Sequence, residues 1–377
     1  MAIPNLPLRL LQLSGPLQAI GGQLGEATAA EVSENFENYA RNFRDKAQLD
    51  DADVARLGTE FRRLTHEWHP RIGAALDALA EGAGVSTNAV YAINARTELL
   101  AGSPLPLPDA CTASAVLPAA SATGNVLLGQ NWDWASDTPD TTILLATRDE
   151  RGHEVLCLAE AGMLAKVGLN DAGLGLTVNL LRSESDGPRA GVPYHVRLRA
   201  ALEEREFGAA VAAASAGPRA ASVNILIAQA GEHPSAVDLE LSPDGASELT
   251  PDDGLLVHTN HFRAKNDVSD VGPKTMPSTG ARCAQAEAIL RPLRGRISTD
   301  TLEQVFRDHS GGIDAICRHA GADLRLPPGD KTVYSVVMDL SVRRFGIAPG
   351  PVCHNEFSYA GLDELLPDPA SPGACSP

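Results

Sequence analysis

The stretch SPLPLPDA, which ends at Ala110, divides the sequence into two parts of different character. Its closely spaced prolines exclude a helix interior or a central strand, because proline lacks the backbone N–H that both structures use. Before this break, residues 27–100 place apolar side chains at spacings of three and four, which predicts helices. After it, short β-like runs separated by turns begin at Cys111. We therefore expect a helical first third and a remainder built around sheets.

The strands predicted after Cys111 come in blocks interrupted by blocks of helix. Helices are expected over 192–216 and in a region of about 279–320. This order favours sheets covered by helices on their outer faces over a regular βαβ alternation, which places the chain in the α+β class. The strand-like segments are 125–134, 141–150, 153–161, 165–181, 222–230, 236–242, 254–262 and 332–350.

Composition and charge exclude several classes of protein. With 377 residues, 44% of them hydrophobic, the chain can bury one large core or two. The net charge of -17 repels phosphate backbones, so nucleic acid is not expected as a partner. The first residues lack a basic head before an apolar core, and no run of eighteen apolar residues occurs. We therefore expect a soluble cytoplasmic protein without a membrane partner.

The cysteine and histidine spacing gives no metal motif. The six cysteines, at 111, 157, 283, 317, 353 and 375, show no CxxC spacing, so neither a zinc knuckle nor a disulfide framework is predicted. The histidines of HEWH, 66–69, stand three apart rather than four, in what reads as an amphipathic helix. The segment GLGLTV lacks the third glycine of a dinucleotide loop, and no Walker or G-x-S-x-G sequence occurs. The expectation is no metal and no cofactor.

Cys111 has a context that distinguishes it from an ordinary buried thiol. The run DACTASAV places it between small residues at the start of a strand, and GQNWDW supplies a carboxylate and a carboxamide on the expected neighbouring strand. Together these segments resemble the processing site of the acyl-coenzyme A:6-aminopenicillanic acid acyltransferase family (isopenicillin N acyltransferases and relatives), an N-terminal-nucleophile group. The resemblance extends through SGPLQAIGGQLGE, AINARTELL, GLNDAGLGLTVNLL, HTNHF, AICRH and SVVMDLSVRRFGIAPG.

The resemblance implies a four-layer αββα N-terminal-nucleophile sandwich made as a precursor. The thiol of Cys111 attacks the carbonyl of Ala110, so that residues 1–110 become a mostly helical α chain and residues 111–377 an αββα β chain, the two forming one globular unit. The family often has Gly before the cysteine, where this sequence has Ala110. After cleavage the new α-amino group, with an ordinary pKa of about 8, serves as base for its own thiol.

The same resemblance assigns the catalytic roles. Asn260, within HTNHF, is expected to donate its side-chain amide to the oxyanion that forms during acyl transfer. Asp133, within NWDW, is expected to hold the α-ammonium group or to polarise the site.

Further residues are expected to support the site or the substrate. Arg96 and Glu98 are expected to form a buried pair. Asn131 and Trp132 are expected to pack or orient their strand, and Trp134 to line a pocket or join the core. The remaining support residues are Phe262, beside Asn260, and two arginines with planar forks suited to a substrate carboxylate, Arg282 and Arg318.

Two enzymatic outcomes remain open, because either water or an amine can intercept the same acyl-enzyme. We favour hydrolysis of a small N-acyl or aminoacyl amide, since no coenzyme A signature is readable. The alternative is an acyltransferase, in secondary metabolism, that moves an acyl group from an amide or acyl-coenzyme A to an amine. A non-catalytic scaffold of the same fold, or a papain-like hydrolase with His258 or His261 as base, are further alternatives. The expected partners are a small-molecule amide and the associated α and β chains, and the sequence also allows a homo-oligomer.

Overall fold

The sheets of the protein form two layers packed face to face. The computed structural model describes residues 6–101, 103, 109–135, 140–187, 189–320 and 330–366. Strands β2 (Asp109–Val116) and β3 (Leu127–Ala135) of one sheet lie against β7 (Leu174–Leu180) of the other. The larger sheet contains, in spatial order, β1 (Leu10–Ser14), β4 (Thr142–Arg148), β5 (Glu154–Glu160), β6 (Val167–Asn170), β7 (Leu174–Leu180), β8 (Val223–Gln229), β9 (Ser235–Leu241) and β10 (Ala246–Leu249). The smaller contains β11 (Leu255–His258), β2 (Asp109–Val116), β3 (Leu127–Ala135), β12 (Asp330–Asp339), β13 (Arg344–Pro349) and β14 (Ser358–Gly361).

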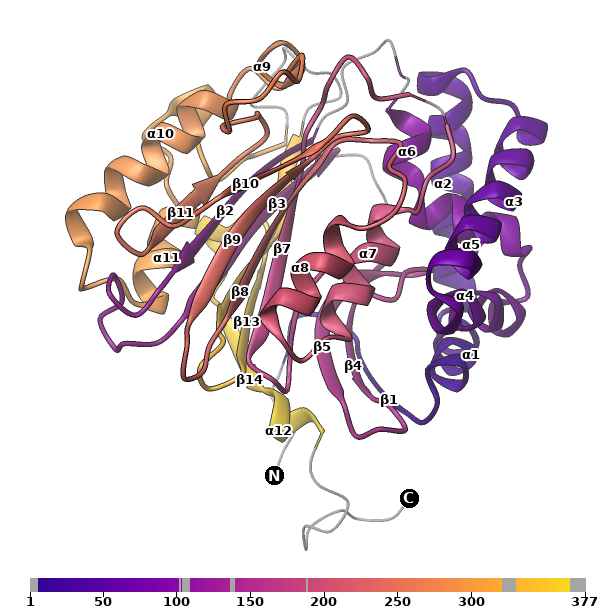
Figure 1. The fold of residues 1–377 in the computed structure, drawn as a ribbon, viewed down its shortest axis with the longest axis horizontal. Helices are drawn as coiled ribbons and strands as arrows, with labels where there is room; N and C mark the ends of the chain where they lie inside the picture. Colours follow the sequence, from indigo (N-terminus) through magenta and orange to yellow (C-terminus); the bar gives the residue numbers. More distant parts are fainter. Residues whose placement is uncertain are drawn as a thin grey trace, which may run out of the picture.

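Helices cover the outer face of each sheet. Helices α7 (Tyr194–Leu202) and α8 (Phe207–Ser215) pack on the larger sheet, and α10 (Thr279–Leu290) and α11 (Thr299–Phe306) pack on the smaller one. Figure 1 shows α10 and α11, in orange, on the side of the sheets opposite to α7 and α8. The expected αββα arrangement of an α+β protein is therefore confirmed.

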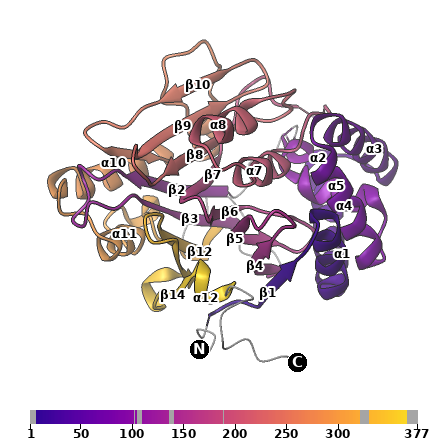
Figure 2. The same cartoon turned by 60° about the horizontal axis from the view of Figure 1, so that its bottom comes forward.

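The first third of the chain forms a group of helices at one end of the sandwich (Figure 1). It consists of α1 (Leu17–Ala27), α2 (Ala29–Ala47), α3 (Asp51–Trp68), α4 (Pro70–Ala83), α5 (Thr87–Asn94) and α6 (Arg96–Leu100). His69 caps α4, and Pro70 occupies its first position, so the HEWH segment forms the end of α3 and the residue between the two helices. Figure 2 shows β1 along the edge of the larger sheet beside β4, its parallel partner. Among the strands of the described residues, all other neighbours are antiparallel.

Helix α1, three short strands and one helix boundary differ from the sequence prediction, in which the helical first part begins at residue 27. Strands β1, β10 and β14 were not predicted, because short edge strands carry only a few residues of alternating pattern. The helical region expected over about 279–320 ends at Phe306, and only the 3₁₀ turns η1 (Arg291–Leu293) and η2 (Gly312–Asp314) add to it. Gly311 and Gly312 belong to DHSGG, 308–312, which the sequence indicates as a helix ending, and glycine disfavours a helix interior. Two further short helices, α9 (Gly272–Thr275) and α12 (Leu362–Leu365), and the turn η3 (Val352–His354) complete the described elements.

None of the helices in the described part of the chain combines the length and the apolar composition that a membrane span requires.

Helices α1 and α4 approach closely through glycines. A Cβ atom on Gly21 would overlap the carbonyl oxygen of Ala75, and one on Gly25 would overlap that of Leu79. Gly22, one residue along, has its nearest α4 atom, the carbonyl oxygen of Ala78, at 3.9 Å. The close contact therefore depends on Gly21 and Gly25 and not on every glycine of α1.

We predict that Gly21→Ala lowers the free energy of unfolding by about 1–3 kcal/mol, because the added methyl group forces the two helices apart. Gly22→Ala is the matched control, and it should leave the free energy unchanged or raise it by up to about 1 kcal/mol through higher helix propensity. Urea denaturation followed by circular dichroism measures both. Equal effects of the two substitutions would contradict the packing described.

Candidate active site

Cys111 lies at the start of β2, where it is 3% exposed. In the antiparallel register of β2 and β3 it stands opposite Trp132, so both side chains project toward the larger sheet. Lys166, between β5 and β6, places its Nζ atom 2.9 Å from the centre of the Trp132 ring. The Cys111 thiol is therefore inside the sandwich, near a buried cation.

Asn260 and Arg282 hold the backbone of Cys111. The Cys111 N–H donates to Asn260 Oδ1 at 2.8 Å, and the Arg282 guanidinium donates to the Cys111 carbonyl oxygen. Arg282 also donates to Asn260 Oδ1 at 2.7 Å and to Thr112 Oγ1 at 2.9 Å. All of these groups are buried. The peptide groups on both sides of the Cys111 Cα atom are thus fixed by side chains far away in the sequence.

Both the side chain and the backbone of Asn260 are held by further hydrogen bonds. Its Nδ2 atom donates to the carbonyl oxygen of Leu180 at 2.9 Å, and its backbone N–H donates to Thr279 Oγ1 at 2.7 Å. The side-chain oxygen therefore faces Cys111 in the uncleaved chain, whereas the amide donor expected for an oxyanion points toward β7.

Asp133 lies on the opposite face of the smaller sheet from the Cys111 thiol. It stands opposite Ala110 in the register, and it is fully buried. Its Oδ1 atom accepts a hydrogen bond from Thr332 Oγ1 at 2.7 Å. On the same face, Asn131 donates through Nδ2 to the carbonyl oxygens of Phe306 and Ile316, at 2.9 and 3.2 Å. These bonds join β3 to β12, to the last residue of α11 and to the segment after η2.

Arg318 is connected to Asp133 on the outer face of the smaller sheet, whereas Phe262 has a different partner. The backbone N–H of Arg318 donates to Thr332 Oγ1 at 2.9 Å, so Arg318 and Asp133 share this hydroxyl group. Arg318 is 4% exposed. Phe262 is only half-buried and donates its backbone N–H to Asp270 Oδ2 at 3.0 Å.

The expected pair of Arg96 with Glu98 is wrong. Arg96 Nη2 lies 2.8 Å from Glu160 Oε1, and Glu98 Oε1 accepts a hydrogen bond from the backbone N–H of Tyr194 at 2.7 Å. Residues two apart on a helix point to different sides, so a direct contact within α6 is geometrically unfavourable. Burial raises the pKa of Glu98 to about 7.

Glu160 is the centre of a buried charge cluster that sequence reasoning missed. It binds Arg96, Lys166 Nζ at 3.0 Å and the Tyr39 hydroxyl at 2.9 Å. Burial alone would raise the pKa of Glu160, but the charges of Arg96 and Lys166 hold it below its ordinary value. Burial lowers the pKa of Lys166 to about 7, against the opposing effect of Glu160. A glutamate and a lysine inside the nearly apolar segment 155–169 were the signal available in the sequence.

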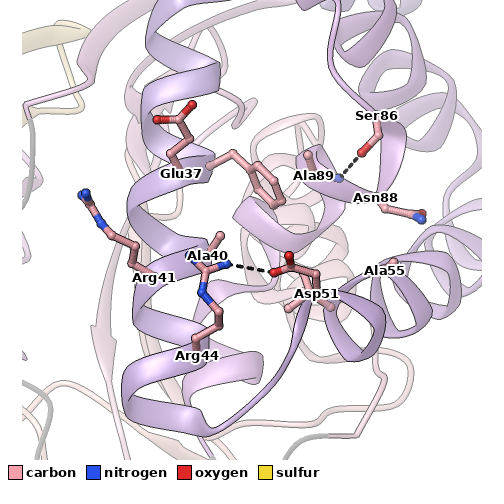
Figure 3. A pocket seen from close by; sticks show the side chains of 11 residues that line it. Glu37, Ala40, Arg41, Arg44, Asp51, Ala55, Ser86, Asn88 and Ala89 are labelled. Atoms are coloured by element: carbon pink, nitrogen blue, oxygen red, sulfur yellow. Dashed lines mark hydrogen bonds and ion pairs between the residues drawn. The ribbon is translucent and has the colours of Figure 1, made fainter.

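A cavity of about 110 Å³ adjoins this cluster, lined in part by Trp132, Trp134 and Glu160. Trp134 therefore lines a pocket on the side of β3 that Cys111 also faces. A larger cavity of about 740 Å³ lies among α2, α3 and α5 (Figure 3). None of its lining residues comes from a strand, so this second cavity is separate from the candidate site.

The two histidines of HTNHF have other partners. The ring nitrogens of His258 contact Glu240 Oε1 at 2.8 Å and the carbonyl oxygen of Thr259 at 2.9 Å. His261 Nδ1 contacts the hydroxyl group of Thr279 at 2.9 Å, and burial lowers the pKa of His261 to about 4. Both nitrogens of His258 are thus engaged away from Cys111, which disfavours His258 as the base of a papain-like site.

Comparisons with known proteins agree with the sequence motifs. The model of the family described as acyl-coenzyme A:6-aminopenicillanic acid acyl-transferase matches residues 121–347. The chain is 27% identical over 306 residues, 81% of its length, to the acyl-coenzyme A:6-aminopenicillanic-acid-acyltransferase 40 kDa form of Emericella nidulans, of which it covers 83%.

Solved structures with partial likeness include a Caenorhabditis elegans N-acylethanolamine-hydrolyzing acid amidase ortholog, with 18% identity and a TM-score of 0.43, covering 61% of this chain and 93% of that one. A mutant of the conjugated bile acid hydrolase of Clostridium perfringens has 13% identity and a TM-score of 0.44, covering 66% and 96%.

The fold and the site define an enzyme whose candidate nucleophile, a buried cysteine, begins a strand of a two-sheet sandwich. The chain belongs to the acyl-coenzyme A:6-aminopenicillanic acid acyltransferase family, as the sequence motifs predicted.

We predict that Glu98→Gln makes the protein more stable than the wild type at high pH. The folded wild type keeps the Glu98 proton up to about pH 7, whereas the unfolded chain releases it near pH ~4.3, so wild-type stability falls as the pH rises through this window. The uncharged glutamine keeps the oxygen that accepts from Tyr194, and it should add up to ~3 kcal/mol at pH 8 and nothing near pH 4.

Urea denaturation of both proteins at pH 4, 6 and 8 measures the effect. Glu26→Gln, at an exposed position of α1, is the control and should show no difference across this range. A Glu98→Gln effect that is the same at every pH would contradict the raised pKa.

Proposed function

We propose that this enzyme is a self-processing cysteine amidohydrolase. It cleaves its own chain between Ala110 and Cys111 and then hydrolyses a small N-acyl or aminoacyl amide through an acyl-enzyme on Cys111. The observation that carries the proposal is the pair of contacts that fix the backbone of this residue, from Asn260 on its N–H and from Arg282 on its carbonyl group. An ordinary core cysteine needs no such support from buried polar side chains.

In the processing step, the Cys111 thiol attacks the carbonyl carbon of Ala110. The C–S bond forms as the C–N bond breaks, and the proton lost by the thiol passes to the leaving nitrogen, which becomes the α-amino group of Cys111. Water then hydrolyses the thioester, which leaves a carboxylate on Ala110 and a free thiol. Lys166 and Cys111 interact electrostatically, and the protonated form of Lys166 favours the thiolate that attacks.

In substrate turnover, Asn260 keeps two tasks. Its Oδ1 atom, which accepts the Cys111 N–H in the precursor, is placed to hold the new α-amino group. Its second Nδ2 hydrogen is the donor that we assign to the oxyanion, and such a donor contributes about 3 kcal/mol to lowering a barrier. Arg282 positions both groups, and this task replaces the carboxylate binding expected from the sequence. Asp133 stabilises β3 opposite Ala110 from the outer face, through its hydrogen bond with Thr332.

The two products of cleavage, residues 1–110 and 111–377, stay together as one unit. Strand β1 of the first pairs with β4 of the second over five residue pairs. Across the same junction, Tyr39 donates to Glu160 and Asn35 Nδ2 donates to the carbonyl oxygen of Ala161 at 2.8 Å. These interactions do not involve the peptide bond that is cut.

The first test is intact-mass spectrometry of the purified wild type beside Cys111→Ala. We expect two fragments that meet between Ala110 and Cys111 in the wild type and one chain in the variant, because alanine has no nucleophile. Cys157→Ala, which removes another buried thiol, is the matched control and should still be cleaved. A wild type that stays as one chain, or a cleaved Cys111→Ala, would overturn the proposal.

The second test separates hydrolysis from acyl transfer. The small cavity beside Trp132 and Glu160 supports a small acyl group, while the Emericella nidulans relative is named an acyltransferase. A panel of small N-acyl and aminoacyl amides is incubated with the cleaved enzyme, with and without added amines. We expect the free acid to form in either case and to remain the main product. Turnover that requires the amine would establish acyl transfer instead.

A further inference from the structure

Four side chains of metal-binding type converge on the outer side of the smaller sheet. They are His309, Cys317, His319 and Cys353, and their donor atoms all lie within 4.8 Å of one another. They come from the segment after α11, the segment after η2 and the turn η3, so the chain folds back to collect them. We propose that these residues bind one Zn²⁺ ion as a Cys₂His₂ site.

The distances between the donor atoms fit a tetrahedral ion. Around His319 Nε2, the His309 Nε2 atom lies at 3.0 Å, Cys353 Sγ at 3.3 Å and Cys317 Sγ at 4.0 Å. Zinc bonds of ~2.0 Å to nitrogen and ~2.3 Å to sulfur place tetrahedral donors ~3.3–3.8 Å apart. The three separations bracket this range, so small movements of the side chains suffice to close the site.

The donor set selects zinc by its chemistry. Two thiolates and two imidazoles in a tetrahedral arrangement suit Zn²⁺, whereas carboxylates and water suit Mg²⁺ and Ca²⁺. Two thiolates also neutralise the charge of the ion, which matters because Cys317 is 1% exposed. His309 is exposed, and His319 and Cys353 are half-buried, so the ion has a path from solvent. A cavity of about 50 Å³ borders His309, Cys317 and His319.

The proposed zinc site lies next to residues that support β3, so we assign it a structural role. Arg318 lies between two of the ligands, and its backbone N–H binds Thr332, which in turn binds Asp133. The residue before Cys317, Ile316, accepts a hydrogen bond from Asn131. A bound ion therefore ties the segment that supports β3 to the turn η3. The site revises the expectation of no metal, which rested on local spacing, because Cys353 is distant from the other ligands in the sequence.

Metal content of the untagged full-length chain, purified with zinc present, tests the proposal. We expect one zinc per chain in the wild type and near-background zinc in His309→Ala and Cys353→Ser. His233→Ala, which removes an exposed histidine elsewhere, is the matched control and should keep the metal. Cys111→Ala should also keep it, so the outcome is independent of self-processing. Zinc retained by both ligand variants, or absent from the wild type, would overturn the proposal.

Cobalt titration of the chelator-treated wild type avoids reliance on variants that fail to fold. We expect a thiolate-to-cobalt charge-transfer band and tetrahedral ligand-field bands that saturate at one Co²⁺ per chain, and a higher Tm on adding Zn²⁺. The charge-transfer band should weaken in Cys353→Ser. Octahedral spectra without a thiolate band would contradict the site, as would a Cys317–Cys353 disulfide in the peptide map of the alkylated native protein.

Discussion

The antiparallel pairing of β2 with β3 decides where the groups of the candidate site lie. It places Cys111 opposite Trp132, facing the larger sheet, and Ala110 opposite Asp133, facing the outer helices. A slip of one residue would exchange the two faces. Every residue of β3 is buried, so such a slip would take the buried Asp133 carboxylate away from the Thr332 hydroxyl group that donates to it, which is strongly disfavoured. The register thus places the Cys111 thiol and the Asp133 carboxylate on opposite faces of the smaller sheet.

The cluster around Glu160 joins the helical first third to this sandwich. Tyr39 and Arg96 come from the helices, whereas Glu160 and Lys166 come from the larger sheet and its loop. Buried ions are costly unless their partners satisfy them, so the cluster favours one way of docking the helices. Lys166 of this cluster also lies against the ring of Trp132, which stands opposite Cys111. Docking of the two parts and the electrostatics of the thiol therefore depend on one group of contacts.

Periodicity predicted most of the elements, and local reasoning failed where partners come from elsewhere. The helices of residues 27–100 and the strands β3 to β9 follow the predicted segments, but the edge strands β1, β10 and β14 were too short to recognise. Arg96 and Glu98 were both expected to be buried, which is confirmed, yet their pairing was wrong because the true partner of Arg96 is on β5. The local sequence pattern around Arg96 does not indicate a partner that lies so far away in the sequence.

The sequence by itself determined the family, the two-sheet class of the fold and the candidate nucleophile, because these depend on the order of motifs and on the change of pattern at Cys111. Only the tertiary structure decided how Arg282 and Asn260 bind the backbone of Cys111. It also decided that Cys353 lies beside His309, Cys317 and His319. These groups meet through the packing of α10 on the smaller sheet and the return of the chain after β13. Such contacts depend on which surfaces bury one another, and periodicity within a segment does not specify that choice.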